Sequence, residues 1–185
     1  MKASSRNIDD AHPELQKRWQ WIVNEYALLY PDEPQPQISQ TYRNEIDQNI
    51  IYARGSSKVR YPHSTHNLNP SWALDYFFIE IENGKEVTSY RQEWIDRVGE
   101  LGEKLGLFWG KRWGWDAAHL ALVEKTSQTT IDSLKLLPEL PEHTQIESVW
   151  KVKIYNTIQD GDDIITRVSV KDKTVHIRGE KKEES

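Results

Sequence analysis

Two pairs of residues in the sequence could do chemistry together. His66 is followed nine positions later by Asp75, and Asp116 is followed three positions later by His119. A catalytic zinc ion takes three nitrogen or oxygen ligands from the protein and keeps a fourth position for water. His66, Asp75 and His119 could supply these ligands. Asp116 could then take the proton of the water and pass it to a leaving amine.

Each of these residues also has an ordinary structural explanation. A single histidine on an apolar strand is commonly a hydrogen-bonded core residue, and Asp75 could cap the aromatic strand in which it stands. Asp-x-x-His pairs also arise by chance. His63 could form a ligand pair with His66, or it could lie at the edge of a pocket or in solvent. The spacing alone leaves these alternatives open.

The composition limits the classes of function. The chain has 185 residues and no cysteine, which indicates one domain with a small appendage and excludes disulfides, zinc-thiolate sites and thiol nucleophiles. Any metal must therefore be held by imidazole and carboxylate. The formal net charge of −5 argues against sequence-independent binding of nucleic acid, which requires a basic surface.

Neither a targeting segment nor a membrane span is expected. The N-terminal lysine is not followed by the apolar stretch of a secretory signal peptide. No window approaches the roughly 18 apolar residues that a membrane-spanning helix needs. We therefore expect synthesis in the cytoplasm without a signal peptide.

Periodicity and turn residues predict the elements that position these groups. Helical spacing predicts helices at residues 14–30, 44–54, 88–105 and 131–137. Apolar and β-branched runs predict strands at residues 37–42, 73–82, 107–110 and 119–123. Three further runs, at residues 149–158, 164–170 and 174–178, predict a β-meander because turn residues separate them.

Four of the eight tryptophans lie near the candidate ligands or in the loop that leads to one: Trp72, Trp109, Trp113 and Trp115. We interpret them as rigid walls of the metal cleft. Trp113 and Trp115 are the two that we expect to contact a substrate.

The motifs occur in the order found in a known enzyme family. The pattern His66-Asn67-x-x-Pro70-Ser71-x-Ala73-x-Asp75, a Trp/Gly-rich loop and Asp116-x-x-His119 resemble the zinc peptidoglycan peptidases of the D-Ala-D-Ala carboxypeptidase/L-Ala-D-Glu endopeptidase family (VanY-like). Many phage endolysins belong to this family. Upstream, Thr41-Tyr42-Arg43-Asn44 and Tyr52-Ala53-Arg54-Gly55 resemble its Gly-Tyr-Arg-Ser and Leu-Tyr-Ala-x-Gly stretches. The resemblance covers about residues 11–123.

The resemblance implies a role for each matched position. His66, Asp75 and His119 would hold one zinc ion per chain, and Asp116 would be the general acid/base. Arg43 would stabilise the oxyanion of the tetrahedral intermediate or bind a substrate carboxylate. Two further matched positions, Gln48 and Ser64, would bind substrate together with Trp113 and Trp115. His63 has no counterpart in the family pattern.

The expected fold is α+β, with helices packed on a small antiparallel sheet that carries a zinc cleft, plus a C-terminal β-meander. Residues 1–125 would form the zinc peptidase core. Residues 126–185 would form an extension made of the short helix, the meander and a charged tail.

The predicted function is hydrolysis of an amide bond in the peptide stem of peptidoglycan. L-Ala-D-Glu endopeptidase activity is the first choice. D-Ala-D-Ala carboxypeptidase activity and cell-wall binding without cleavage are the alternatives. The last alternative is motivated by the tryptophan loop, which differs from the one usual in the family, and by the additional β-meander. We expect a monomer that is released to the cell wall in the manner of a phage lysin.

Overall fold

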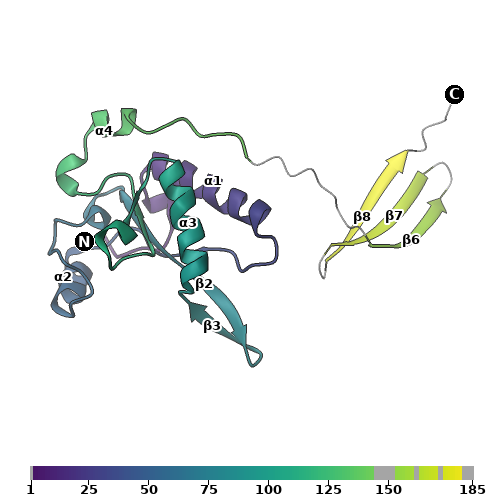
Figure 1. Cartoon of the computed structure of the whole chain (residues 1–185), viewed down its shortest axis with the longest axis horizontal. Coiled ribbons are helices and arrows are strands. Elements are labelled where there is room, and N and C mark those ends of the chain that lie inside the picture. The colour runs from purple at the N-terminus through teal and green to yellow at the C-terminus, as the bar shows by residue number, and fades with distance from the viewer. Residues whose placement is uncertain (1, 144–152, 161–162, 171–172, 181–185) are drawn as a thin grey trace. The chain divides into compact units, whose positions relative to one another are not determined.

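The computed structural model describes residues 2–143, 153–160, 163–170 and 173–180. The chain divides into two compact units, Met1–Thr144 and Gln145–Ser185 (Figure 1). Among the described residues, no helix combines the length and the apolar character that a membrane crossing requires.

The first unit contains four α-helices and five strands. The helices are α1 (Pro13–Leu29), α2 (Glu45–Ala53), α3 (Gln92–Lys104) and α4 (Ile131–Lys135). The strands are β1 (Gln37–Gln40), β2 (Ala73–Glu82), β3 (Lys85–Ser89), β4 (Phe108–Trp109) and β5 (His119–Ala121). Short 3-10 helices are η1 (Ile8–Asp10), η2 (Thr65–Asn67), η3 (Gly110–Trp113) and η4 (Thr126–Gln128).

The strands form one antiparallel sheet around β2. The strand order is β1-β2-β5-β4, and β3 pairs with the C-terminal half of β2. Side chains along β2 alternate between the two faces, so Leu74, Tyr76 and Phe78 all lie on one face and are fully buried. Asp75 consequently lies on the opposite face.

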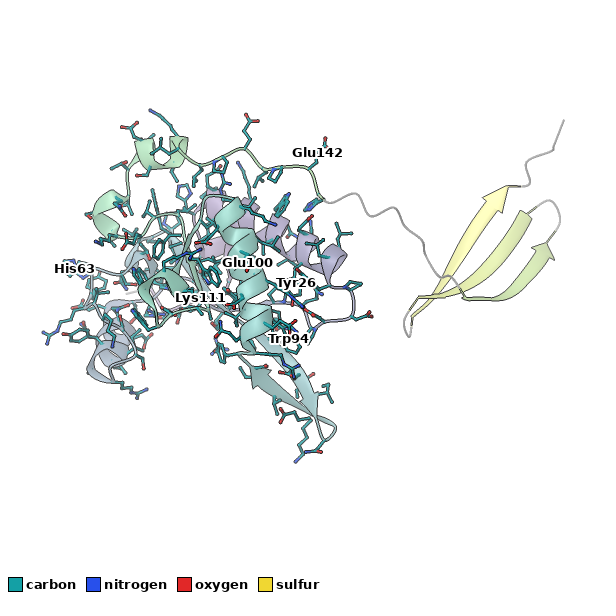
Figure 2. All side chains as sticks on the ribbon, in the orientation of Figure 1. Tyr26, His63, Trp94, Glu100, Lys111 and Glu142 are labelled. Atoms are coloured by element: carbon teal, nitrogen blue, oxygen red, sulfur yellow. The ribbon has the colours of Figure 1, made fainter. Side chains whose placement is uncertain are left out.

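Helices α1 and α3 cover the buried face of the sheet. Tyr26 of α1 and Trp94 of α3 both pack against Phe78 of β2, with ring centroids 5.7 and 5.4 Å apart respectively (Figure 2). These contacts join the two helices and the sheet in one hydrophobic core. The sheet face that carries Asp75 therefore stays available for a site.

Local sequence signals set the ends of several elements. Helix α1 starts with Pro13 at its first position, where proline lacks only an N–H that would be unpaired anyway. Asn44 caps α2 by accepting a hydrogen bond from the Asp47 N–H, and Gly55 follows the helix at a φ of +79°. Asparagine is a preferred N-cap residue, and glycine readily adopts the positive φ that follows a helix.

The predicted start of the third helix is wrong. Strand β3 occupies residues 85–89, and α3 begins only at Gln92. Asn83 and Gly84 both have positive φ, +51° and +77°, as a type I′ hairpin turn requires. This turn sends the chain back along β2, so Val87 and Thr88 pair with the strand instead of starting a helix.

The second unit is the predicted β-meander. Its strands are β6 (Lys153–Asp160), β7 (Asp163–Val170) and β8 (Lys173–Glu180), paired antiparallel in sequence order. Asp160 pairs with Asp163, and Val170 pairs with Lys173, so the described strands are paired up to their ends. Together with the helices and sheet of the first unit, this confirms the α+β fold class.

Within the first unit, the segment around residues 138–141 packs against α1. The buried guanidinium of Arg18 donates hydrogen bonds to the carbonyls of Leu105 and Pro138, at 2.7 and 2.8 Å. The indole N–H of Trp21 donates to the carbonyl of Pro141 at 2.7 Å. The predicted division into a core and an extension at residue 125 stays a prediction.

Arg18→Met tests the importance of this anchor. We expect it to lower the free energy of unfolding by roughly 2–4 kcal/mol, because the carbonyls of the buried Leu105 and of Pro138 lose a charged donor. Urea denaturation measures the change. The control Lys17→Met removes an exposed ion pair with Glu14 and should cost less than about 1 kcal/mol. Equal losses in the two variants would contradict the anchor.

Candidate metal centre

The site is built on a cross-strand pair. Asp75 of β2 lies directly opposite His119 of β5 in the antiparallel register, so both side chains leave the sheet on the same face. The next pair, Leu74 and Leu120, points the other way and is fully buried in the core. Burial of the leucines therefore fixes the register that brings Asp75 and His119 together.

His66 reaches the same place from the short helix η2. The hydroxyl of Ser64 accepts a hydrogen bond from the His66 N–H at 3.3 Å, and the side chain of Asn67 accepts one from the Ser64 N–H at 3.1 Å. The carbonyl of His66 accepts from the N–H of Arg43 at 2.9 Å. These bonds hold the turn, so Ser64 acts on the site by positioning His66 as well as by lining the pocket.

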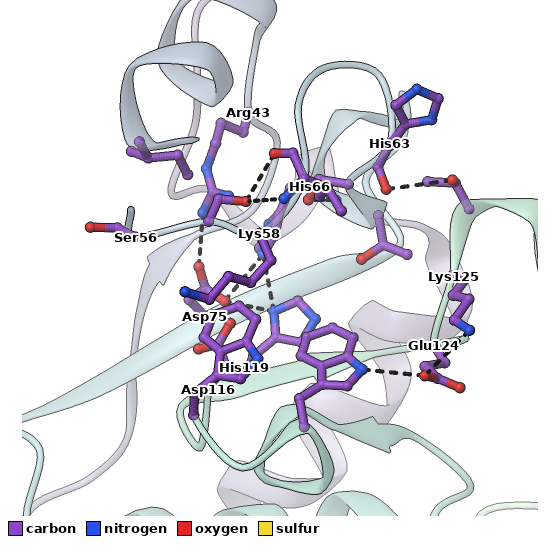
Figure 3. A pocket seen from close by; sticks show the side chains of 18 of the residues that line it. Arg43, Ser56, Lys58, His63, His66, Asp75, Asp116, His119, Glu124 and Lys125 are labelled. Atoms are coloured by element: carbon purple, nitrogen blue, oxygen red, sulfur yellow. Dashed lines mark hydrogen bonds and ion pairs between the residues drawn. The ribbon is translucent and has the colours of Figure 1, made fainter. Parts of the chain in front are cut away.

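Three ligand atoms meet at one point (Figure 3). His66 Nε2 lies 3.1 Å from Asp75 Oδ1 and 3.2 Å from His119 Nδ1, and the last two atoms are 2.8 Å apart. Ligands roughly 2.1 Å from a tetrahedral zinc ion would lie about 3.4 Å from one another. The three atoms are therefore grouped almost as a metal ion would hold them, and they could bind one.

The imidazole hydrogen bonds fit this arrangement. His66 Nδ1 lies 2.6 Å from the carbonyl of Thr41 and donates to it, which leaves Nε2 with a lone pair facing the group. His119 Nε2 is buried and has no hydrogen-bond partner among the described residues, so only Nδ1 of this ring has polar neighbours. With a lone pair on each imidazole nitrogen, the three atoms form a set that could bind one shared cation.

The electrostatics favour the protonation states of metal ligands. Burial alone would raise the pKa of Asp75, but His66 and His119 together outweigh it and hold this pKa well below its usual range. Burial lowers the pKa of His66. An ionised carboxylate beside a neutral imidazole is the form in which these groups bind metals.

Arg43 and Gln48 hold the carboxylate of Asp75 through the oxygen that does not face the imidazoles. Arg43 donates to Asp75 Oδ2 at 3.0 Å and to Gln48 Oε1 at 3.2 Å, so Asp75 Oδ1 is left to face the two imidazoles. Gln48 is fully buried and does not line the pocket. In this position Gln48 orients Arg43 and is not in contact with the space where a substrate would lie.

Asp116 lines the same pocket as the three ligands. Burial raises its pKa above the usual value, and the nearby charge of Asp75 adds to the increase, whereas His119 and Arg43 oppose it. Its carboxylate has no hydrogen bond or ion pair within the described part of the chain. Asp116 thus supplies a partly buried carboxyl group beside the candidate ligands His66, Asp75 and His119. This carboxyl group is free to exchange a proton.

Gly110 permits this close packing of Asp116 and His119. A Cβ atom at Gly110 would lie 2.3 Å from the carbonyl oxygen of Asp116 and 2.9 Å from the Cβ of His119. The loop between them is held by the indole N–H of Trp109, which donates to the carbonyl of Ala117 at 2.6 Å. Only glycine leaves room for the chain to fold back at this distance.

The pocket has a volume of about 530 Å³, and two tryptophans form one of its walls. Trp113 and Trp115 are stacked with ring centroids 5.6 Å apart, and Trp113 lies 5.3 Å from the ring of His119. The indole N–H of Trp113 donates to Glu124 at 3.3 Å. Both tryptophans are therefore placed to contact a molecule bound over the ligand group.

His63 lies at the rim, away from the ligand group. Its side chain is exposed and extends from the surface of the first unit (Figure 2). Lys58 and Glu124 also line the pocket, and no sequence motif points to either. Each is a charged residue in an irregular segment without a motif, so only the folded chain reveals its position.

Comparisons with known proteins add a similarity among solved structures. No protein-family profile matches the sequence. No curated protein matches it. Among solved structures, the L-Ala D-Glu endopeptidase ChiX of Serratia marcescens is similar at 20% identity and a TM-score of 0.45, over 62% of this chain and 82% of that chain. Similarity at this level does not show a shared activity.

Gly110→Ala tests the close packing at the site. We expect roughly 10- to 100-fold weaker metal binding, because Asp116 and His119 must move apart. Titration of the metal-free protein with zinc measures this. In the control Gly114→Ala, the added Cβ meets no atom within 4 Å, but φ is +85°. The control should lose about 1 kcal/mol of stability and keep its metal affinity; equal affinity in both variants would refute the assignment.

Proposed function

We propose that the protein is a zinc-dependent hydrolase that cleaves an amide bond in the peptide stem of peptidoglycan, with the L-Ala-D-Glu bond as the first candidate. The observation that carries the proposal is the meeting of His66 Nε2, Asp75 Oδ1 and His119 Nδ1 at one side of an open pocket. The ordered motifs around these residues add the substrate class.

The donor set suits zinc. Two imidazole nitrogens and one carboxylate oxygen make the three-ligand set of catalytic zinc sites, and the pocket leaves room for a fourth ligand. Zinc in such a site lowers the pKa of bound water to about 7 and polarises a carbonyl group. No cysteine competes for the ion, because the sequence has none.

Asp116 is the residue proposed to move the proton. Its carboxylate faces the pocket without a partner in the described part of the chain and has a raised pKa. It accepts a proton from the attacking water and donates it to the nitrogen of the leaving amine. A base whose pKa lies nearer the working pH does this more efficiently than an ordinary exposed aspartate.

Other residues orient the reacting groups. Arg43 holds Asp75 Oδ2 and places a permanent positive charge at the pocket, where negative charge develops on the carbonyl oxygen during attack. Trp113 and Trp115 supply a stacked aromatic surface for the peptide. Rigid aromatic walls cost little conformational entropy on binding.

Product analysis tests the bond assignment. Purified peptidoglycan is digested with the zinc-loaded protein, and the new ends are identified. A new N-terminal D-Glu supports L-Ala-D-Glu endopeptidase activity, whereas free D-Ala supports the carboxypeptidase alternative. Wall binding without new ends would favour the non-catalytic alternative. Release to the cell wall in the manner of phage lysins belongs to the proposal as well.

Asp116→Asn should abolish most of the hydrolysis while the protein keeps its zinc. We expect the rate to fall roughly 100- to 10,000-fold, since the amide cannot relay the proton. The matched control is Glu124→Gln, which neutralises another pocket carboxylate and should change the rate much less. Full lytic activity in Asp116→Asn would rule out the proposed mechanism.

Removal of the metal should stop hydrolysis reversibly. Dialysis against a chelator is expected to abolish cleavage of peptidoglycan, and one equivalent of zinc per chain should restore it. Metal analysis of the purified protein gives the stoichiometry independently. Protein that is purified without bound metal and cleaves peptidoglycan in the presence of chelator would contradict the zinc assignment.

A further inference from the structure

Lys58 differs from the other cations of the pocket. Arg43 is bound to Asp75 at 3.0 Å, and Lys125 Nζ lies 3.9 Å from a carboxylate oxygen of Glu124. Within the described part of the chain, Lys58 has no ion-pair partner. Its ammonium lies 5.7 Å from the ring centroid of Trp115, and its side chain extends across the pocket in Figure 3. A positive charge thus lines the pocket without an ion pair to any carboxylate of the described residues.

The segment that carries Lys58 is fixed to the metal centre by one buried amide. Gln48 Nε2 donates to the hydroxyl of Ser57 at 3.0 Å and to the carbonyl of Val59 at 2.7 Å. The other end of the same amide, Oε1, accepts from Arg43. The residues on both sides of Lys58 are therefore held at a set position relative to the ligand group, although the lysine itself is exposed.

A second donor lies beside Lys58. Ser56 lines the same pocket, is exposed, and its hydroxyl makes no hydrogen bond to any described residue. The ammonium lies over the face of Trp115, and the hydroxyl comes from the same short anchored segment, two residues earlier. Two free donors, one of them charged, match a carboxylate.

We propose that Lys58, with Ser56 beside it, forms a carboxylate-binding subsite that selects substrates carrying a free carboxylate at this edge of the pocket. The inference rests on the proposed function, since it concerns the substrate of the same site. The aromatic face of Trp115 covers the apolar part of the bound residue. Arg43 is less suited to bind this substrate carboxylate, because its guanidinium already donates hydrogen bonds to Asp75 and Gln48.

A stem peptide offers two carboxylates of this kind. D-glutamate is joined through its side-chain carboxyl, so its α-carboxyl stays free or is amidated, and the last residue carries a terminal carboxyl. The test uses N-acetyl-L-Ala-γ-D-Glu-L-Lys in four forms, with a carboxylate or a carboxamide at each of these two positions. Comparison within each pair identifies which carboxylate Lys58 binds.

The experiment measures kcat and KM separately for the zinc-loaded full chain. We expect one carboxylate form to be preferred over its carboxamide by about tenfold or more in kcat/KM, mainly through KM. Lys58→Gln should reduce this preference to about one, whereas Lys58→Arg should retain most of it. The control Lys125→Gln, at the opposite part of the lining, should leave the preference and the zinc content unchanged.

A binding arm separates failure of the subsite from failure of the proposed function. Calorimetry with the γ-D-Glu-L-Lys dipeptides, which lack the scissile bond, measures the same carboxylate preference without turnover. A preference that Lys58→Gln keeps, or no preference in either assay, would overturn the subsite. Binding that depends on the carboxylate and on Lys58, without hydrolysis of any peptide, would support the subsite and refute the proposed activity.

Discussion

The pairing of β2 with β5 determines where every other group of the site must lie. It places Asp75 opposite His119 on one face of the sheet, while Leu74 and Leu120 enter the core on the other. A shift of one residue would exchange the two faces and bury the carboxylate among α1 and α3. The apolar core therefore specifies the polar site, because the same register serves both.

The carboxylate of Asp75 is the electrostatic centre of this arrangement. One oxygen faces two imidazoles and the other is held by Arg43, so a single negative charge satisfies three neighbours. Burying such a group is costly unless its partners compensate. The fully buried Gln48 completes the support, since its amide fixes Arg43 at one end and the segment around Lys58 at the other.

Much of the fold and of the candidate metal centre could be predicted from the sequence. The four residues at the centre of the pocket, the cap at Asn44 and the whole of β2 follow from residue types, local spacing and family resemblance. Asn83 and Gly84 predict a turn, but the helical spacing around Trp94 extends back to Thr88, so the prediction assigned the end of β3 to the helix. Turn geometry outweighed periodicity there.

The position of Gln48 could not be predicted from local pattern, because it depends on contacts far along the chain. A glutamine on a helix normally faces solvent, but the loop after α2 folds over this one and accepts hydrogen bonds from its Nε2, while Arg43 donates to its Oε1. The charge at Lys58 is placed by the same contact. The geometry of the candidate metal centre and the lining of the pocket are thus joined through a residue that makes no hydrogen bond to any of the three candidate ligands, and the two properties cannot vary independently in this fold.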